Sequence, residues 1–295
     1  MDSRTPGAWL RRNCVRAFLR RARRPSTVEL SRSAIVFAPH PDDETLGCGG
    51  TIAMKRRAGA AVTVVFMTDG RSSHAHLMPA EDLARLRRQE ALAACNCLGV
   101  TQENVIFLEF PDGSLQAHEA DAAKRVQAVL RDRRPRDVYV PYKNEPPHDH
   151  VATYRAVTAA LQTHCEPVTV FAYPVWYWDH WPWTRLPRPG RRATASAMVR
   201  SIAAGFGLRM SRLFPHVVDI RDAMPDKRAA LAAHRTQMQR VQPGTNWPIL
   251  ADVSDGEFLD CFLRPFELFQ RYEAGSNLSE APVASASQGI AETSP

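Results

Sequence analysis

A histidine and three carboxylates follow an apolar run near the start of this chain. The run at residues 34–38, Ala-Ile-Val-Phe-Ala, is typical of a buried strand, and His40, Asp42, Asp43 and Glu44 come directly after it. Carboxylates crowded at the end of a strand repel one another unless a cation offsets their charge. Histidine and aspartate are ligands of zinc and of similar divalent metals. The cluster therefore predicts a metal site that includes His40 and Asp43.

A second group of candidate ligands, His148 and His150, follows another strand-like run at 137–141. In a doubly wound sheet of strand order 3-2-1-4-5, the first and fourth strands are neighbours, so their carboxyl ends meet. This topology places the two histidines beside His40 and Asp43. A catalytic zinc site needs three protein ligands and one open position. The simpler alternatives are a helix N-cap for the first acids and a surface pair for the two later histidines.

Three carboxylates remain outside the predicted ligand set. Asp42 adjoins a ligand in the turn, and a carboxylate beside a metal-bound water can take its proton as general base. Glu44 enters the following helix and is expected to orient a neighbour or the backbone. Asp149 can accept a hydrogen bond from a ligand histidine. These residues favour metal-assisted hydrolysis with Asp42 as the base.

The elements that must position these residues alternate between strands and helices. Strands are predicted at 35–37, 62–67, 105–108, 137–141, 168–172 and 217–220, and helices at 80–98, 117–133, 151–164, 194–210 and 223–239. Short connections between alternating elements predict a Rossmann-like open, mostly parallel sheet with helices on both faces. The fold class is therefore α/β.

Composition divides the chain into a core domain and two terminal segments. A basic arm at 1–32 precedes a single catalytic domain at 33–275, and a tail at 276–295 rich in Ser, Ala and Glu is predicted to be disordered. The domain contains a basic, Trp- and Pro-rich insertion at 179–213. Six apolar residues of the arm would share one helix face, which favours packing on the domain over anchoring in a membrane. They are Trp9, Leu10, Cys14, Val15, Phe18 and Leu19.

The formal net charge of +7 is concentrated in two segments. Residues 1–24 hold eight arginines and one acid, and residues 179–213 hold seven arginines and one acid. A solvated basic surface is the simplest interpretation, and attraction to an anionic lipid surface or an anionic substrate is the alternative. Nucleic-acid binding is not expected, because aromatic residues do not alternate with the basic ones. No apolar run long enough to span a membrane and no signal-peptide core occurs, so we expect a cytoplasmic protein, peripheral at most to a membrane.

Several motifs resemble those of the LmbE/PIG-L superfamily of metal-dependent N-deacetylases. The resemblance is most specific at 39–44 and extends over residues 34–240. The other matching segments are 68–71, 87–91, 98–100, 110–115, 149–153 and 227–237. The resemblance implies hydrolysis of the N-acetyl group of an N-acetylglucosamine-type sugar conjugate, which releases acetate and a free amino sugar.

The resemblance also implies roles for individual residues. Zinc, or another divalent metal such as iron(II), would be bound by His40, Asp43 and His150, with Asp42 as the base. Arg71 and Asp112 would help to hold the sugar, although Arg71 also suits a solvated surface and Asp112 suits a type I turn.

One position departs from the pattern of the family. The family often has a histidine three residues before its last ligand, where it helps to polarise the substrate carbonyl. This chain has Pro147 there, and His148 is shifted by one position. We expect either His148 or another donor to take this role.

Two other functions are compatible with these residues. One is a related amidase that cuts a larger acyl group or a thiol-conjugate amide. The other is a carbohydrate-binding protein that has lost catalysis, which the intact Asp42 disfavours. His234 lies in a segment that resembles the late helix of the family, and the alternative is a buried histidine of the core.

Overall fold

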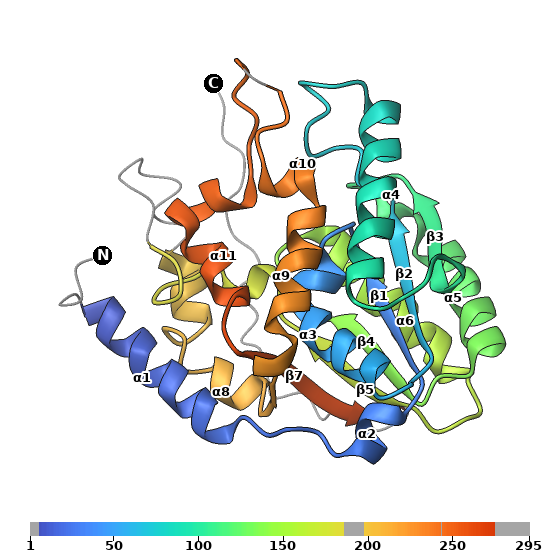
Figure 1. Ribbon diagram of the computed structural model, residues 1–295, viewed down its shortest axis with the longest axis horizontal. Coiled ribbons are helices and arrows are strands. Elements are labelled where there is room, and N and C mark those ends of the chain that lie inside the picture. Colours follow the sequence, from blue (N-terminus) through green and yellow to red (C-terminus); the bar gives the residue numbers. More distant parts are fainter. Residues whose placement is uncertain (1–5, 186–197, 243, 275–295) are drawn as a thin grey trace, which may run out of the picture.

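The computed structural model describes residues 6–185, 198–242 and 244–274 (Figure 1). The tail at 276–295 and part of the helix predicted at 194–210 lie outside these residues. In the described chain, a seven-stranded sheet has the order β3-β2-β1-β4-β5-β7-β6. No helix of this described part is both long and apolar enough to span a bilayer.

Five consecutive strands of the sheet are parallel. They are β1 (Ala34–Ala38), β2 (Val62–Thr68), β3 (Val105–Phe110), β4 (Asp137–Pro141) and β5 (Thr169–Tyr173). Every residue of β1, β2, β4 and β5 is buried, as expected for strands covered on both faces. The predicted order and the α/β fold class are confirmed.

Helices cover both faces of this sheet (Figure 1). On one face lie α3 (Asp43–Arg57), α4 (Ala80–Cys97) and α9 (Met224–Ala233), and on the other α5 (Glu119–Arg133) and α6 (His148–Gln162). The other helices with given bounds are α1 (Pro6–Arg21), α2 (Thr27–Ser31), α8 (Met210–Leu213), α10 (Arg235–Met238) and α11 (Glu257–Phe262). The 3-10 turns are η1 (Gln102–Asn104), η2 (Leu115–His118), η3 (Trp176–Trp178), η4 (Arg221–Ala223) and η5 (Leu250–Gly256).

The far edge of the sheet differs from the prediction. Strand β7 (Phe266–Glu273), which the sequence did not predict, pairs antiparallel with both β5 and β6 (His216–Asp219). The predicted helix at 223–239 is interrupted at His234, whose φ of −77° and ψ of 63° are not helical. This break separates α9 from α10 and turns the His234 side chain into the domain.

A buried ion pair fastens α9 and α3 to β7. The Lys227 amine lies 2.7 Å from a carboxylate oxygen of Glu267 and donates to the carbonyl of Leu46. Glu267 also accepts the backbone N–H groups of Gly50 and Thr51. Both charged side chains are almost fully buried, so each depends on the other for its charge balance.

Helix α1 of the basic N-terminal arm packs against the domain. Helix α1 buries Phe18, whose ring lies 6.0 Å from that of Trp183 and 5.5 Å from that of Phe266. Cys14 and Val15 also pack on the core, but Trp9 and Leu19 are exposed. The predicted apolar stripe therefore divides between a packing face and a solvent face.

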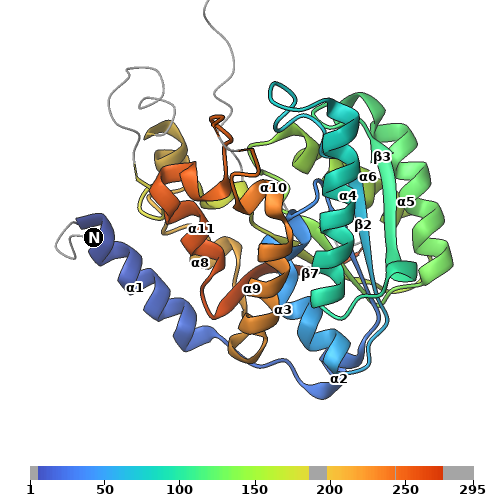
Figure 2. The same cartoon turned by 45° about the horizontal axis from the view of Figure 1, so that its top comes forward.

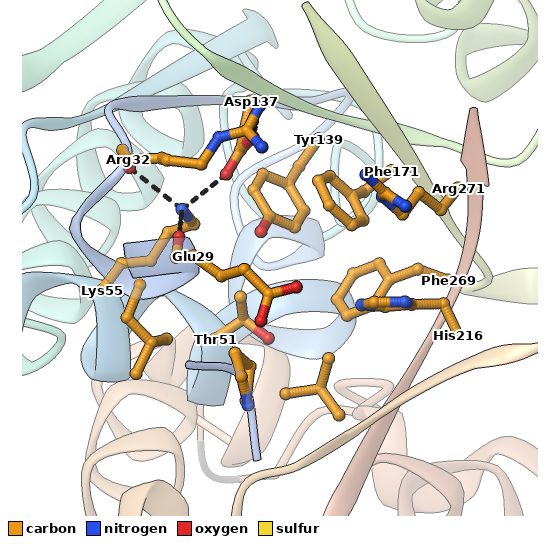
Figure 3. Close-up of a pocket in the computed structure, with 13 residues that line it drawn as sticks. Glu29, Arg32, Thr51, Lys55, Asp137, Tyr139, Phe171, His216, Phe269 and Arg271 are labelled. Carbon is orange, nitrogen blue, oxygen red and sulfur yellow. Dashed lines mark hydrogen bonds and ion pairs between the residues drawn. The ribbon is translucent and has the colours of Figure 1, made fainter. Parts of the chain in front are cut away.

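A small cavity lies at the amino end of the sheet, opposite the carboxyl ends of β1 and β4 (Figure 3). The Lys55 amine at its wall bonds to Asp137, the first residue of β4, at 2.7 Å and to the carbonyls of Glu29 and Arg32 at 3.0 Å each. Its volume of about 30 Å³ suits about one water molecule. These contacts hold α2 and the end of α3 to the sheet.

Candidate metal centre

The candidate site lies where the direction of strand addition reverses. Strands β1 and β4 are neighbours, yet the chain continues from β1 toward β2 and from β4 toward β5. Ligands of open α/β sheets bind at the carboxyl ends of such strands, because the following loops separate there. His40 follows β1, and His150 lies in the first turn of α6 after β4. Topology alone thus brings these two histidines together.

Asp43 joins the two histidines. Its Oδ2 atom lies 3.2 Å from Nδ1 of His40 and 3.3 Å from Nε2 of His150. Nitrogen and oxygen atoms of the three residues all lie within 4.8 Å of one another. The same Oδ2 accepts the backbone N–H of His40 at 3.0 Å, which fixes the turn between β1 and α3.

The charges of the three residues depend strongly on one another. Burial alone would lower the pKa of His150, but Asp43 and Glu145 raise it to about 9. Burial likewise opposes protonation of His40, yet Asp112, Asp149 and Asp43 raise its pKa well above the ordinary value. The pKa of Asp43, which burial would raise, is held well below its usual range by His150 and His40. These shifts favour an ionised Asp43 carboxylate that is paired with the positive charges of His40 and His150.

This group fits a divalent cation. His150 is fully buried, and carboxylate oxygens of Asp43 and Glu145 lie 3.3 and 3.5 Å from its two ring nitrogens, but neither nitrogen makes a well-aligned hydrogen bond to a described residue. A buried imidazole without hydrogen bonds is costly, and coordination to a metal satisfies one nitrogen. A second group, His40 with Asp112 and Asp149, is also close enough to hold an ion. In that group both ring nitrogens of the histidine already make hydrogen bonds, whereas those of His150 do not, so the group with His150 is the better site.

Asp42 lies beside this group in a constrained conformation. Its φ of 132° is a region that non-glycine residues rarely adopt, and such strain persists only where the surroundings enforce it. Arg87 contributes to this constraint, because its guanidinium lies 3.3 Å from Asp42 Oδ2 and also bonds to the carbonyl of Pro41. Burial raises the pKa of Asp42 to about 7, with a contribution from Asp43, while Arg87 lowers it.

Glu44 supports Asp42 from the first turn of α3. Its Oε2 accepts the backbone N–H of Asp42 at 3.0 Å, and its Oε1 lies 2.8 Å from Nε2 of His234. Burial opposes protonation of His234, but Glu44 and Asp42 raise its pKa. The expected role of Glu44 as an orienting residue thus has a geometric basis, and His234 is linked to the site rather than merely packed.

Asp149 lies on the outer side of His40. Its Oδ2 is 3.3 Å from Nε2 of His40, and its two oxygens accept the N–H groups of Gly113 and Leu115 at 2.7 and 3.0 Å. These backbone hydrogen bonds hold the Asp149 carboxylate in place independently of its contact with His40. The structure brings Asp149 to His40 as the sequence suggested, and its role toward a bound metal stays a prediction.

Asp112 also reaches His40, at 3.1 Å from Nε2. It accepts the N–H of Ser72, so it ties the loop after β2 to the loop after β3. Arg71 lies further out, in an ion pair with Asp69 at 2.6 Å. Arg71 lines a cavity of about 420 Å³ that begins at Pro41, the residue between His40 and Asp42. Arg71 thus lines this cavity, whereas Asp112 lies against His40, and the role of both residues in holding a sugar stays a prediction.

Glu145 is a site residue that the sequence did not suggest. Its buried carboxylate lies 3.5 Å from Nδ1 of His150 and accepts the backbone N–H groups of residues 175–177. It therefore connects the predicted third ligand to the turn η3. In the sequence, only the closeness of Glu145 to His150 hints at this role. Its backbone partners come 30 positions later in the chain, so no local pattern links them to Glu145.

His148 is not brought into the group. Its side chain is exposed, and no described contact joins it to His40, Asp43 or His150. His148 and His150 are two positions apart at the start of α6, so their side chains point about 200° apart around the helix. Only one of them can face the site from this helix. A catalytic role for His148 stays a prediction that this geometry does not favour.

Comparison with known proteins places the chain in a family. A model of the PIG-L family, described as GlcNAc-PI de-N-acetylase, matches residues 35–161. A 1D-myo-inositol 2-acetamido-2-deoxy-alpha-D-glucopyranoside deacetylase from Mycobacterium sp. (strain KMS) is 31% identical over 265 residues, which cover 78% of this chain and 82% of the relative. The chain belongs to the PIG-L family.

Further similarities agree with this assignment. A probable N-acetyl-alpha-D-glucosaminyl L-malate deacetylase 2 from Bacillus cereus is 27% identical and covers 74% of this chain and 89% of its own length. The fold resembles that of the N,N'-diacetylchitobiose deacetylase from Pyrococcus horikoshii, with a TM-score of 0.55, 21% identity and coverage of 82% and 84%. The PIG-L resemblance, the fold class and the prediction of an enzyme of the N-deacetylase class are confirmed.

Proposed function

We propose that this PIG-L enzyme hydrolyses the N-acetyl group of an N-acetylglucosamine-type sugar conjugate, with zinc held by His40, Asp43 and His150 and with Asp42 as the base. The products are acetate and a free amino sugar. One observation carries the proposal: Nδ1 of His40 and Nε2 of His150 converge on Asp43 Oδ2, directly beside the constrained carboxylate of Asp42.

The chain's own groups account for the proton transfers. When bound, a divalent cation supplies positive charge that makes a water more acidic and polarises an acetyl carbonyl. Asp42 takes one proton from the attacking water as its oxygen bonds to the carbonyl carbon. The C–N bond then breaks, and Asp42 returns that proton to the leaving nitrogen. The guanidinium of Arg87 keeps the carboxylate in place throughout the cycle.

The substrate side of the site suits a sugar. The cavity of about 420 Å³ at Pro41 has charged walls that include Arg71 and Asp69, together with the ring of Phe107. Polar groups of this kind bond to sugar hydroxyls. The ring of Phe107 itself is covered by the Arg88 guanidinium at 4.0 Å and stacks on Phe66. Arg71 and Asp112 are therefore proposed to hold the sugar, and relatives named for inositol and malate conjugates define the class of aglycone to examine first.

The identity of the metal follows from the ligand types. Two imidazoles and one carboxylate suit zinc, and iron(II) takes the same set. Zinc is proposed because an open fourth position on this set is typical of zinc hydrolases. A cytoplasmic location and a small glycoconjugate substrate complete the proposal.

A substrate panel tests the proposal. Acetate release is measured with N-acetylglucosaminyl inositol, N-acetylglucosaminyl malate and diacetylchitobiose, using protein treated with a chelator and then supplied with zinc or iron(II). Release that disappears with the chelator and returns with zinc supports the proposal. If the metal-loaded protein releases acetate from none of these compounds but cleaves a longer acyl or thiol-conjugate amide, the deacetylase proposal is wrong and the related amidase takes its place.

A further inference from the structure

Exposed apolar side chains gather in one short segment of the chain. Among the described residues, five of the eight large apolar side chains that are exposed lie between residues 198 and 208. Val199 is 65% exposed, Ile202 57% and Leu208 59%. Soluble proteins scatter such residues singly, so a concentration of them marks an interaction surface.

Helix α1 extends this surface. The first turn of α1 lies against Trp181, since a side chain at Gly7 would meet the indole nitrogen at 2.9 Å. Trp181 in turn contacts the 198–208 segment, with its ring 5.7 Å from that of Phe206. Trp9 is 62% exposed. Figures 1 and 2 show α1 and residues 198–213, which are drawn in gold, at the same end of the molecule.

Both parts of the surface are rich in arginine, and only Arg11 and Arg200 among these arginines form ion pairs in the described chain, with Glu257 and Asp179. Helix α1 contains five arginines and no acid, and residues 198–213 contain three arginines and no acid. Arg12, Arg16 and Arg20 are exposed and follow Trp9 at helical spacing on the solvent face of α1. Aliphatic and aromatic side chains surrounded by arginine are typical of proteins that lie in the interface of an anionic bilayer.

We propose that α1 and residues 198–213 form a docking surface for an anionic lipid bilayer. Charge complementarity decides this choice of partner. A second copy of the chain would bring the same arginines together, and nucleic acid offers nothing to bury Val199, Ile202 and Leu208. Anionic headgroups neutralise the arginines while the acyl boundary takes up the aliphatic side chains.

The surface is physically continuous with the metal centre. Glu145, which lies beside His150, accepts backbone N–H groups of the turn η3, and the segment that continues from η3 carries Trp181 to the docking surface. Residues 176–183 thus run from the candidate site to the proposed bilayer contact.

Vesicle binding tests the proposal with the full-length protein. Sedimentation with vesicles of phosphatidylcholine alone is compared with vesicles containing equal amounts of phosphatidylcholine and phosphatidylglycerol, at low and at high salt. We expect binding to the anionic vesicles, and weaker binding at high salt. Absence of binding to anionic vesicles at low salt would overturn the proposal.

Two variants locate the contact. Replacing Arg12, Arg16 and Arg20 by Gln should weaken partitioning about a hundredfold, because each arginine near an anionic surface contributes roughly fivefold. Ile202→Ser with Leu208→Ser should weaken it at least about tenfold through lost apolar burial. All five side chains are exposed, so folding is expected to be unaffected.

Matched controls remove the same groups elsewhere. Arg131, Arg133 and Arg134 replaced by Gln removes equal charge from the end of α5, and Val28→Ser removes an exposed apolar side chain outside the surface. Both controls should bind vesicles like the unchanged protein. If vesicle binding falls equally in the controls and in the variants, the assignment is contradicted. It is also contradicted if the protein self-associates without vesicles and the Ile202 and Leu208 changes abolish that self-association.

Discussion

His234 and Glu44 form a buried ion pair, with Nε2 of the histidine 2.8 Å from Oε1 of the carboxylate. The other oxygen of Glu44 accepts the N–H of Asp42, whose backbone is strained. His234, which lies 190 positions after Glu44 in the chain, thus helps to hold the proposed base Asp42 in its conformation. The proposed reactivity of Asp42 depends on this link as well as on Arg87.

Replacing His234 tests this link. His234→Ala should lower kcat about tenfold to a hundredfold, because a small displacement of the base is enough to slow the reaction to this extent. The KM and the amount of bound metal should change little. His234→Gln should recover much of the loss, since its amide can still donate to Glu44. His216→Ala, a half-buried histidine outside the site, is the control, and an equal loss there would contradict the link.

Glu145 gives a prediction about metal affinity. Glu145→Gln removes the charge that faces Nδ1 of His150, so it should weaken metal binding about tenfold to a hundredfold. Competition with a chelator measures this affinity without any activity assay. Glu119→Gln, which removes a carboxylate at the start of α5, should leave it unchanged. Unchanged affinity in Glu145→Gln would show that Glu145 serves only the turn η3.

Metal binding should depend on pH in a definite direction. In the metal-free chain the pKa values of His40 and His150 are raised, that of His150 to about 9, so both carry protons at neutral pH. A cation needs neutral imidazoles and must displace these protons. Affinity should therefore rise with pH, roughly tenfold per pH unit for each displaced proton, and level off above the raised pKa values. Calorimetry in buffers of different ionisation enthalpy counts the protons, and binding without proton release would contradict the ligand set.

The buried Lys227–Glu267 pair predicts a large loss of stability. Lys227→Met leaves the Glu267 charge buried without its partner, which should lower the free energy of unfolding by about 3–5 kcal/mol. Urea unfolding of the chelator-treated protein measures this change. Adding Glu267→Gln should restore part of the stability, because the uncompensated charge disappears. Lys124→Met on the exposed side of α5 should stay within about 0.5 kcal/mol of the unchanged protein.

The parallel half of the fold could be predicted because its strands are unbroken apolar runs. Such runs arise where both faces of a strand are covered, and β1, β2, β4 and β5 are buried throughout. Strand β7 was missed because Glu267, Arg271 and Glu273 interrupt its apolar pattern. The burial of Glu267 depends on Lys227, a partner that no local pattern reveals.

The candidate site could be predicted as far as strand topology determines it. His40, Asp43 and His150 follow neighbouring strands, so the switch point alone brings them together. The partners Arg87, Glu145 and His234 required knowledge of how helices and turns pack against the sheet. His148 was expected nearer the site, because sequence proximity to His150 does not show which side of α6 it faces.

A comparison of the unchanged protein with Asp42→Asn, with bound metal and acetate release recorded on the same samples, tests the proposed base and the metal centre together. The substitution keeps the shape of the side chain but removes its ability to accept a proton. We expect both proteins to bind one metal ion per chain, and the variant to lose about a hundredfold to ten-thousandfold in kcat. Acetate release by Asp42→Asn at the rate of the unchanged protein would contradict the assignment of the base. Absence of bound metal from both proteins after incubation with zinc or iron(II) would contradict the metal centre itself.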